Sequence, residues 1–554
     1  MTLQLLTGPL FKQMVQHGAT NLSNHRERIN KLNVFPVPDG DTGTNMDLSL
    51  TSGLNELKAT NEDTLSVLLS AFVKGLLMGA RGNSGVILSQ LFRGFSQHLQ
   101  EETEVTSEAF AKALENGVHV AYESVTNPVE GTILTVAKDA AKEALHSAQK
   151  EANLAIVMEK TLQAAKRSLA NTPELLPILK EVGVVDSGGE GLVVIYEGFL
   201  AALKGEALPE HFDDVAIETM VQVEHDRAVQ ALIDAESIEY GYCTEFLVLL
   251  DESEVERSFM EKDFRTHLSS YGDSLLVATD ENVVKVHIHT EQPGEVMTYA
   301  QQFGQLHQID IDNMRKQHEH IVKEDSHSDE ILTGTNERYG LIAVAAGDGL
   351  KSTFTSLGVT HIIEGGQTMN PSTEDILRAI ESIRAEHVFI LPNNKNIILA
   401  SEQAKQLTEK SVTIIPSKSI PQGISALFAF DKEIVETENE TNMKEALSDV
   451  KTGLITYATR DTVVNKLQIK ADSYIGLDDE TIVATEDKKI SAATALLQAL
   501  IDEDDELVTI FFGDDVSDEE VNELHSFIDD ELPHVEVEFV QGGQPVYSFV
   551  IMVE

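Results

Sequence analysis

The stretch Asn33-Val-Phe-Pro-Val-Pro-Asp39-Gly-Asp41-Thr-Gly-Thr-Asn45-Met46 places two carboxylates one residue apart on a loop broken by proline and glycine. Such a loop can aim both side chains at one hard cation, with hydroxyl and amide groups immediately behind them. Mg²⁺ is the natural candidate, because it prefers oxygen ligands and shares its coordination sphere with substrate phosphates. The same residue types also make ordinary surface turns, so that alternative stays open at this point.

A second glycine-rich turn follows a predicted helix. Apolar residues recur at helical spacing over residues 65–77, and the turn 79–85 (Gly-Ala-Arg-Gly-Asn-Ser-Gly) separates them from another apolar helix that begins near Val86. Asn83 or Ser84 is predicted to be the N-cap of that helix. A turn that leads into a helix start presents free backbone N–H groups and the positive end of the helix dipole, which suits a phosphate. A simple corner between two helices is the alternative, and the arginine of the turn is given no role.

Composition and charge limit the class of protein. The 554 residues, 42% of them hydrophobic, predict two to four domains with real cores. One Cys and no Trp indicate no disulfide framework and a reducing compartment. The N-terminus lacks the pattern of a signal peptide, and charges interrupt each long apolar stretch. These features predict a cytoplasmic protein with no transmembrane segment.

The charge is extreme: 41 Lys and Arg stand against 92 Asp and Glu, a formal net charge of −51. This field repels a phosphate backbone, which argues against nucleic acid as a partner. A nucleotide can bind only where metal ions and backbone dipoles reverse the potential locally. Acidic runs at 502–506 and 514–520 are interpreted as a solvated surface, with a docking face for a basic partner as the alternative.

The pattern changes along the chain. Up to about Gly205 it is almost entirely helical, and two more loops, 127–132 and 184–191, each precede an apolar helix; helix capping alone would explain either loop. From about residue 338, strand-like and helix-like runs alternate, which predicts a parallel sheet with helices on both faces. The turn 347–349 (Gly-Asp-Gly) is interpreted as a strand–helix connection, with anion binding as the weaker alternative.

A strand in the middle of the chain carries candidate metal ligands. In Val284-Lys-Val-His287-Ile-His289 the valines and the isoleucine are predicted to face a core, and the two histidines to share the opposite face. Two imidazoles at this spacing can bind one transition metal, with Cys243, the only thiol, as the third ligand. Solvated histidines are the alternative.

Four motifs, in chain order, resemble the nucleotide-binding L-type domain of dihydroxyacetone kinases: the loop 39–46, the turn 82–85, the pair 131–132 and the loop 186–189. The resemblance implies a barrel of antiparallel helices that closes around a Mg²⁺-ATP site. That family uses three aspartates, and the first falls here on or next to Asn33, which leaves the number of metal ions open. The resemblance implies catalytic and metal-binding roles for Asp39 and Asp41, with Asn33 as a further Mg²⁺ ligand, and nucleotide contacts by Thr42, Thr44, Asn45, Asn83, Ser84, Thr132 and Asp186.

The whole chain resembles the ATP-binding subunit of bacterial fatty acid kinase. That resemblance implies a multidomain fold: an all-α helical barrel (1–205), an α+β middle domain (209–324) with a Zn²⁺ site at Cys243, His287 and His289, and an α/β DegV-like C-terminal domain (338–554) that docks an acyl-carrying partner. It also implies a homodimer formed through the middle domain.

The activity implied is ATP-dependent phosphorylation of a fatty acid carboxylate held by a separate fatty-acid-binding protein, giving acyl-phosphate for phospholipid synthesis. Two alternatives remain. One is a kinase of dihydroxyacetone or a similar small hydroxy-ketone, and the other is a regulator that binds nucleotide or lipid without catalysis.

Overall fold

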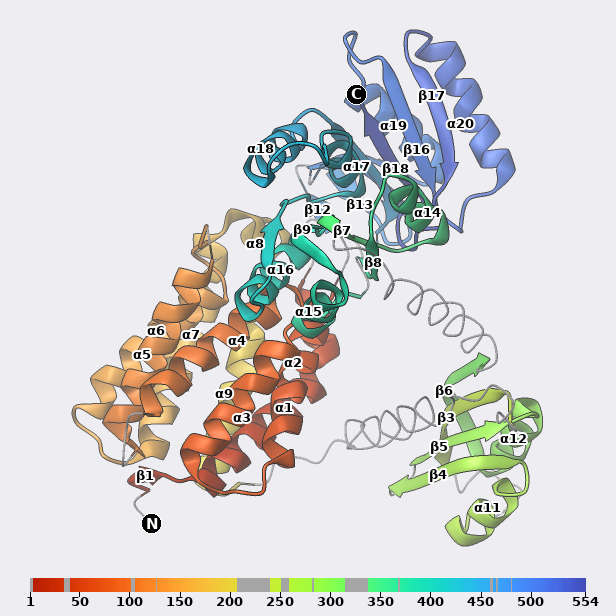
Figure 1. The fold of residues 1–554 in the computed structure, drawn as a ribbon. Coiled ribbons are helices and arrows are strands. Elements are labelled where there is room, and N and C mark those ends of the chain that lie inside the picture. Colours follow the sequence, from red (N-terminus) through yellow and green to blue (C-terminus); the bar gives the residue numbers. More distant parts are fainter. Residues whose placement is uncertain are drawn as a thin grey trace. The chain divides into compact units, whose positions relative to one another are not determined.

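The computed structural model of the chain describes residues 3–33, 40–100, 105–125, 127–206, 240–250, 259–280, 283–313, 337–366, 369–458, 462–464, 467–479 and 481–554. The chain divides into two compact units, one made of Met1–Leu208 together with Asn336–Glu554 and the other of Pro209–Thr335. The first unit therefore contains a helical region and a C-terminal region that are separated in sequence (Figure 1).

The helical region is an up-and-down arrangement of amphipathic helices around one apolar core. Helices that follow one another through short loops pack side by side, and α1 also packs against α9 (Figure 1). Phe11, Phe72 and Phe92 form a chain of edge-to-face rings inside this core. The helices are α1 (Gly8–Leu32), α2 (Thr42–Ala59), α3 (Leu65–Met78), α4 (Gly82–Leu99), α5 (Ser107–Ser124), α6 (Ile133–Ala148), α7 (Leu154–Leu175), α8 (Pro177–Val182) and α9 (Ser187–Lys204).

Two details of this region differ from the sequence prediction. Helix α4 begins at Gly82 with Arg81 at its N-cap position, so the prediction of Asn83 or Ser84 as the N-cap is wrong. Gly82 has φ +56, and this turn of the backbone lets the helix start earlier than its apolar pattern suggests. A two-residue strand pair, β1 (Leu5–Leu6) with β2 (Val105–Thr106), lies where only helices were expected.

The first half of the C-terminal region is a parallel sheet of strand order β10-β9-β7-β8, which confirms the predicted alternation of strands and helices. Its strands read as near-continuous apolar runs because both faces are covered. The elements are β7 (Glu337–Ala345), α14 (Asp348–Ser356), β8 (His361–Glu364), α15 (Thr373–Ser382), β9 (Ala385–Leu391), α16 (Lys395–Leu407), β10 (Ser411–Ile414), α17 (Ile420–Phe428) and α18 (Glu436–Ala446).

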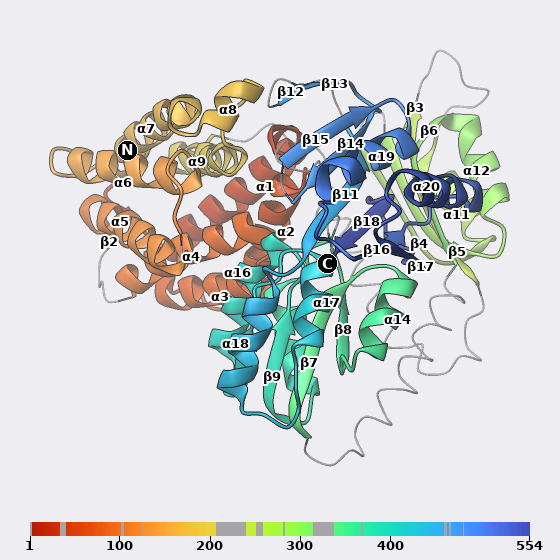
Figure 2. The same ribbon diagram turned by 90° about the horizontal axis from the view of Figure 1, so that it is seen from above.

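The second half is a six-stranded sheet of order β15-β14-β11-β18-β16-β17, which the sequence prediction missed (Figures 1 and 2). All its pairs are antiparallel except β16 with β17, and β11 pairs with β18 from the end of the chain. Its elements are β11 (Lys451–Tyr457), β14 (Tyr474–Asp478), β15 (Thr481–Glu486), α19 (Lys489–Leu500), β16 (Leu507–Phe512), α20 (Asp518–Glu531), β17 (Glu536–Gln541) and β18 (Phe549–Val553), beside a hairpin of β12 (Thr462–Val464) and β13 (Leu467–Ile469).

The second unit contains an antiparallel sheet of order β4-β5-β3-β6 with short helices packed on it. Val284, Val286 and Ile288 are buried, which confirms that the predicted alternation of strand β5 places these residues in the core. The elements are β3 (Tyr242–Leu250), α11 (Glu261–Leu268), β4 (Gly272–Asp280), β5 (Val283–Thr290), α12 (Pro293–Ala300), the 3₁₀ helix Gln301–Phe303 and β6 (Gly304–Asn313). Across both units, no helix within the described ranges combines the length and apolar character that a membrane crossing needs.

The turn after β7 joins the two sheets of the C-terminal region. Gly347 has φ +100, and the backbone N–H of Leu350 donates to the carbonyl of Gly542 at 3.1 Å. A Cβ atom on Gly349 would lie 1.7 Å from the carbonyl oxygen of Gln541. Glycine is needed at both positions because the two backbones approach so closely that a side chain would collide. The turn therefore acts as a packing contact between the two sheets.

We expect Gly349→Ala to lower the free energy of unfolding by roughly 1–3 kcal/mol, because the added methyl group must push two backbones apart. Urea unfolding of the full chain measures this loss. The matched control is Gly366→Ala, whose new Cβ would meet its nearest neighbour, the Cβ of Ala346, at an ordinary 3.8 Å. Equal stability of the two variants would contradict the packing role of the turn.

Candidate functional site

Four helices begin at the same end of the helical region, and their starts are linked by side chains. The hydroxyl of Ser187, at the start of α9, donates to the hydroxyl of Thr42 at the start of α2, at 3.2 Å. The carboxylate of Asp186 accepts the N–H of Gly189 at 2.7 Å and also that of Ile133 at the start of α6. The loops around these residues are the ones that the sequence singled out.

The start of α4 approaches α2 equally closely. The N–H of Arg81 donates to the hydroxyl of Ser49 at 3.2 Å. A Cβ on Gly82 would lie 2.5 Å from Nδ2 of Asn45, and one on Gly85 would lie 2.3 Å from the Ser49 hydroxyl oxygen. Glycine is required at both positions for this approach. The starts of α2, α4, α6 and α9 therefore form one cluster of helix N-termini, an arrangement that favours an anion.

Of the two aspartates predicted to bind metal, Asp41 lies within the described residues, at the start of α2. It is 9% exposed. Burial raises its pKa, and hydrogen bonds from the side chains of Asn45 and Asn370 oppose that rise. Asn370 Nδ2 donates to Asp41 Oδ2 at 2.5 Å, and Asn33 Nδ2 donates to Asp41 Oδ1 at 3.4 Å. A buried carboxylate of this kind is most stable when a positive charge is nearby.

The residues around Asp41 fit a hard cation. Carboxylate and amide side chains supply the oxygen ligands that Mg²⁺ prefers. The Oδ1 atom of Asn370 is buried, and no hydrogen-bond partner for it exists in the described part of the chain. Asp39, the other predicted metal ligand, lies outside the described residues.

The remaining predicted nucleotide contacts lie at the same end but differ in their partners. The backbone N–H of Thr44 donates to Asn30 of α1, and its hydroxyl accepts from the same side chain. The hydroxyl of Thr132 donates to the carbonyl of Val129 within its own loop, at 2.8 Å. Asn83 donates to Asn396 of the C-terminal region at 3.2 Å, and Ser84 is half-buried in the first turn of α4.

Sequence reasoning missed three residues of this cluster: Asn30, Arg81 and Asn370. Arg81 donates through Nη1 to the backbone carbonyl of Asn370 at 2.8 Å. Its place in the glycine-rich turn was the available signal. Asn370 lies 329 residues from Asp41 in sequence, so no local pattern could connect the two.

The predicted zinc ligands lie on neighbouring strands of the second unit. The register places Cys243 of β3 opposite His289 of β5, and Glu245 opposite His287. Residues directly opposite in an antiparallel pair have Cβ atoms only about 5 Å apart and share a face. His289 is buried, whereas the side chains of Cys243 and His287 lie outside the described set. The side chains that are described contain no cluster of three potential metal ligands.

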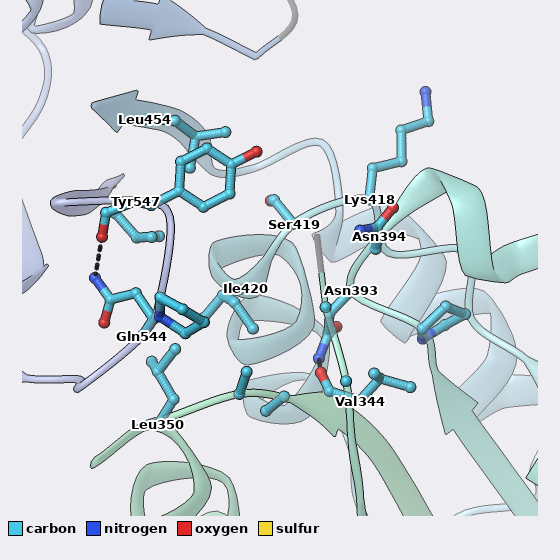
Figure 3. A pocket seen from close by; sticks show the side chains of 17 residues that line it. Val344, Leu350, Asn393, Asn394, Lys418, Ser419, Ile420, Leu454, Gln544 and Tyr547 are labelled. Atoms are coloured by element: carbon cyan, nitrogen blue, oxygen red, sulfur yellow. Dashed lines mark hydrogen bonds between the residues drawn. The ribbon is translucent and has the colours of Figure 1, made fainter. Parts of the chain in front are cut away.

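A cavity of about 70 Å³ lies between the two sheets of the C-terminal region (Figure 3). Asn393 and Asn394, which follow strand β9, line it together with Gln544 from the loop before β18. Asn394 Nδ2 and Gln544 Oε1 are buried there, with no hydrogen-bond partner among the described residues. A cavity that holds one benzene molecule measures about 150 Å³, so this one cannot enclose a long acyl chain.

The carboxylate of the half-buried Asp186 makes the stability of the protein depend on pH. Burial raises the pKa of Asp186 to about 6. Between about pH 4 and about pH 6 the folded state therefore keeps a proton that the unfolded state has lost, so stability falls as pH rises through this range. We expect Asp186→Asn to remove that dependence, because an amide keeps the helix cap without titrating.

Urea unfolding at several pH values measures this change. The difference in unfolding free energy between Asp186→Asn and the parent protein should change by up to about 1.4 kcal/mol per pH unit within the range. Asp63→Asn, which alters an exposed carboxylate at the start of α3, is the control. A constant difference across the range would show that Asp186 ionises normally.

Comparison with known families covers most of the chain. Residues 36–201 match the DAK2 domain, residues 239–321 the FakA-like middle domain of fatty acid kinase, and residues 340–554 the FakA-like C-terminal domain. Solved structures with limited similarity include a DegV family protein, Cg2579, from Corynebacterium glutamicum (12% identical, 39% of this chain, 97% of that chain, TM-score 0.30) and the dihydroxyacetone kinase from C. freundii in complex with AMP-PNP and Mg²⁺ (20% identical, 36% of this chain, 35% of that chain, TM-score 0.29).

Curated relatives match over the full length. Protein YloV of Bacillus subtilis is 49% identical and covers 100% of both chains. An uncharacterized protein of Staphylococcus haemolyticus, SH1689, is 47% identical over 99% of both chains, and SAUSA300_1119 of Staphylococcus aureus is 46% identical over 99% of both. The three consecutive domain matches and these full-length relatives show that the chain belongs to the FakA-like family of fatty acid kinase proteins.

Proposed function

We propose that this chain is the ATP-binding subunit of a fatty acid kinase, which transfers the γ-phosphoryl group of ATP to a fatty acid carboxylate held by a separate protein. The observation that carries the proposal is the cluster of four helix N-termini around the buried carboxylate of Asp41. In a chain with a net charge of −51, this cluster combines positive backbone dipoles with a cation site, which a bound nucleotide needs.

The roles of individual residues follow from their positions. Asp41, with Asn33 and Asp39, would hold Mg²⁺, and the bound ion would neutralise charge on the phosphates. The N–H groups at the start of α4, which include those of Asn83 and Ser84, would hold the phosphates. Thr42, Thr44 and Asn45 would line the same wall.

Asp186 and Thr132 are assigned to the nucleoside end of the site. With a pKa of about 6, Asp186 is ionised at neutral pH, so its carboxylate can accept hydrogen bonds from sugar hydroxyl groups. Its fixed position, as the cap that joins α6 and α9, suits a positioning contact.

The acceptor requires no base. A fatty acid carboxylate is already ionised at neutral pH, so transfer needs only alignment and charge neutralisation. The cavity of about 70 Å³ in the C-terminal region is too small for an acyl chain, and by family resemblance a separate fatty-acid-binding protein delivers the acid. By family resemblance, that protein docks on the C-terminal region, and the chain forms a homodimer through its middle domain.

The test is the formation of acyl-phosphate, trapped with hydroxylamine, when the chain is incubated with Mg²⁺-ATP, a fatty acid and a fatty-acid-binding protein. Acyl-phosphate that forms only when the chain, Mg²⁺-ATP, the fatty acid and the fatty-acid-binding protein are all present supports the proposal. Triose phosphate formed from dihydroxyacetone without any partner would instead support a small hydroxy-ketone kinase, and nucleotide binding without any transfer a regulator.

Within this assay we expect Asp41→Asn to lower the rate of acyl-phosphate formation at least ~100-fold, because the variant loses a charged metal ligand while keeping the shape of the side chain. Asp63→Asn, at the opposite end of the helical region, is the control and should keep full activity. An Asp41→Asn variant with the activity of the parent protein would refute the assignment of the site.

We further propose that Cys243, His287 and His289 bind one Zn²⁺. Elemental analysis of the purified chain should find one zinc per chain, and Cys243→Ser should remove it, because zinc binds thiolate much more tightly than hydroxyl. His307→Gln, on the neighbouring strand β6, is the control. Zinc retained in Cys243→Ser, or absent from the parent protein, would exclude this site.

A further inference from the structure

Residues 369–373, which lead into α15, contact the starts of α2 and α4. Asn370 of this loop donates through Nδ2 to Asp41 Oδ2 at 2.5 Å, while Arg81 binds its backbone carbonyl at 2.8 Å. The N–H of Thr373, at the end of the loop, donates to the carbonyl of Ala80 at 3.0 Å. The C-terminal region is thus anchored on the same turn that is proposed to hold phosphates.

Helix α16 extends this contact along α4. Asn396 accepts a hydrogen bond from Asn83 at 3.2 Å. Gln403 donates to the carbonyl of Leu77 at 2.6 Å and accepts from Gln90 at 2.9 Å. In the helical region these contacts use the side chains of Asn83 and Gln90 on α4 and the carbonyl of Leu77 near the end of α3.

The side chain of Asn370 is 3% exposed, and its Oδ1 has no hydrogen-bond partner in the described chain. Its amide N–H, the positive end of the group, donates to Oδ2 of Asp41, one of the two carboxylate oxygens that a cation could bind. An N–H group and a divalent cation at one carboxylate oxygen repel each other. The docked loop and a metal bound at Oδ2 therefore compete for that oxygen of Asp41.

We propose that this docking is an autoinhibitory latch: the loop that carries Asn370 closes the site at Asp41 and the start of α4, and binding of Mg²⁺-nucleotide requires its release. The inference rests on the proposed function, because it takes this end of the helical region to be the nucleotide site. It adds a closed state in which the C-terminal region blocks that site.

The chemistry of the contact allows it to open. The helical region contributes Ala80 and Val86 to one apolar cluster of the parallel sheet, and Ile178 and Val182 of α8 pack against the other. At the starts of α2 and α4 themselves, the contact is made by hydrogen bonds that involve amide side chains, backbone carbonyls and Arg81. Polar contacts of this kind separate more readily than large apolar ones, because water can replace their hydrogen bonds.

Titration calorimetry of the full chain with Mg²⁺-ADP tests the latch. Asn370→Ala removes the group that covers Asp41, so we expect nucleotide to bind about tenfold more tightly. Gln403→Ala weakens docking away from Asp41 and should also tighten binding. Met369→Ala changes the exposed neighbour of Asn370, which is 69% accessible, and should leave affinity unchanged.

Hydrogen exchange gives a readout that is independent of affinity and activity. The Thr373 amide, which is bonded to Ala80 in the docked state, should exchange faster when Mg²⁺-AMP-PNP is added. Slower exchange, or weaker binding by Asn370→Ala, would show that the loop completes the site, and would overturn the latch while leaving the proposed function intact. No nucleotide binding by the parent protein, Asn370→Ala or Gln403→Ala would overturn both.

Discussion

The rest of this structure depends on one constraint: neighbouring helices of the helical region run in opposite directions. Because neighbouring helices run antiparallel, every second long helix of the region begins at the same end, and the first-turn N–H groups of α2, α4, α6 and α9, which have no partner within their own helix ladder, gather there. Side chains such as Asp186 and Ser187 join these starts to one another. A strongly acidic protein can then offer one local region of positive potential, with the carboxylate of Asp41 set into it.

The sequence predicted those parts of the fold that depend on local pattern. Apolar residues at helical spacing located α3, and buried strand runs located β7 and β9, because each pattern reflects burial of one stripe or of both faces. The six-stranded sheet escaped prediction, since its central pair joins β11 to β18 across about a hundred residues of chain. The start of α4 at Gly82 escaped as well, because a positive φ there depends on close packing against Asn45.

As with the fold, the sequence predicted those residues of the candidate site that local patterns indicate. The four loops of the helical region were identified from their glycines, hydroxyls and carboxylates, and the structure brings them to one end. The contacts of Asn370 and Asn396 were not predictable, because both residues lie in a region of different fold and approach the site only through tertiary packing. Arg81 lies between these two cases: its turn was recognised, but its partner, a backbone carbonyl of a distant loop, has no sequence signature.

The first unit is built from two stretches of chain, Met1–Leu208 and Asn336–Glu554, with the second unit between them in sequence. The helical and C-terminal regions therefore meet as parts of one molecule, and their encounter is set by an effective local concentration instead of the concentration of protein in solution. A contact that separate molecules would rarely form can persist under these conditions. Dilution cannot dissociate it, whereas a single cut in the connecting chain turns it into a bimolecular equilibrium.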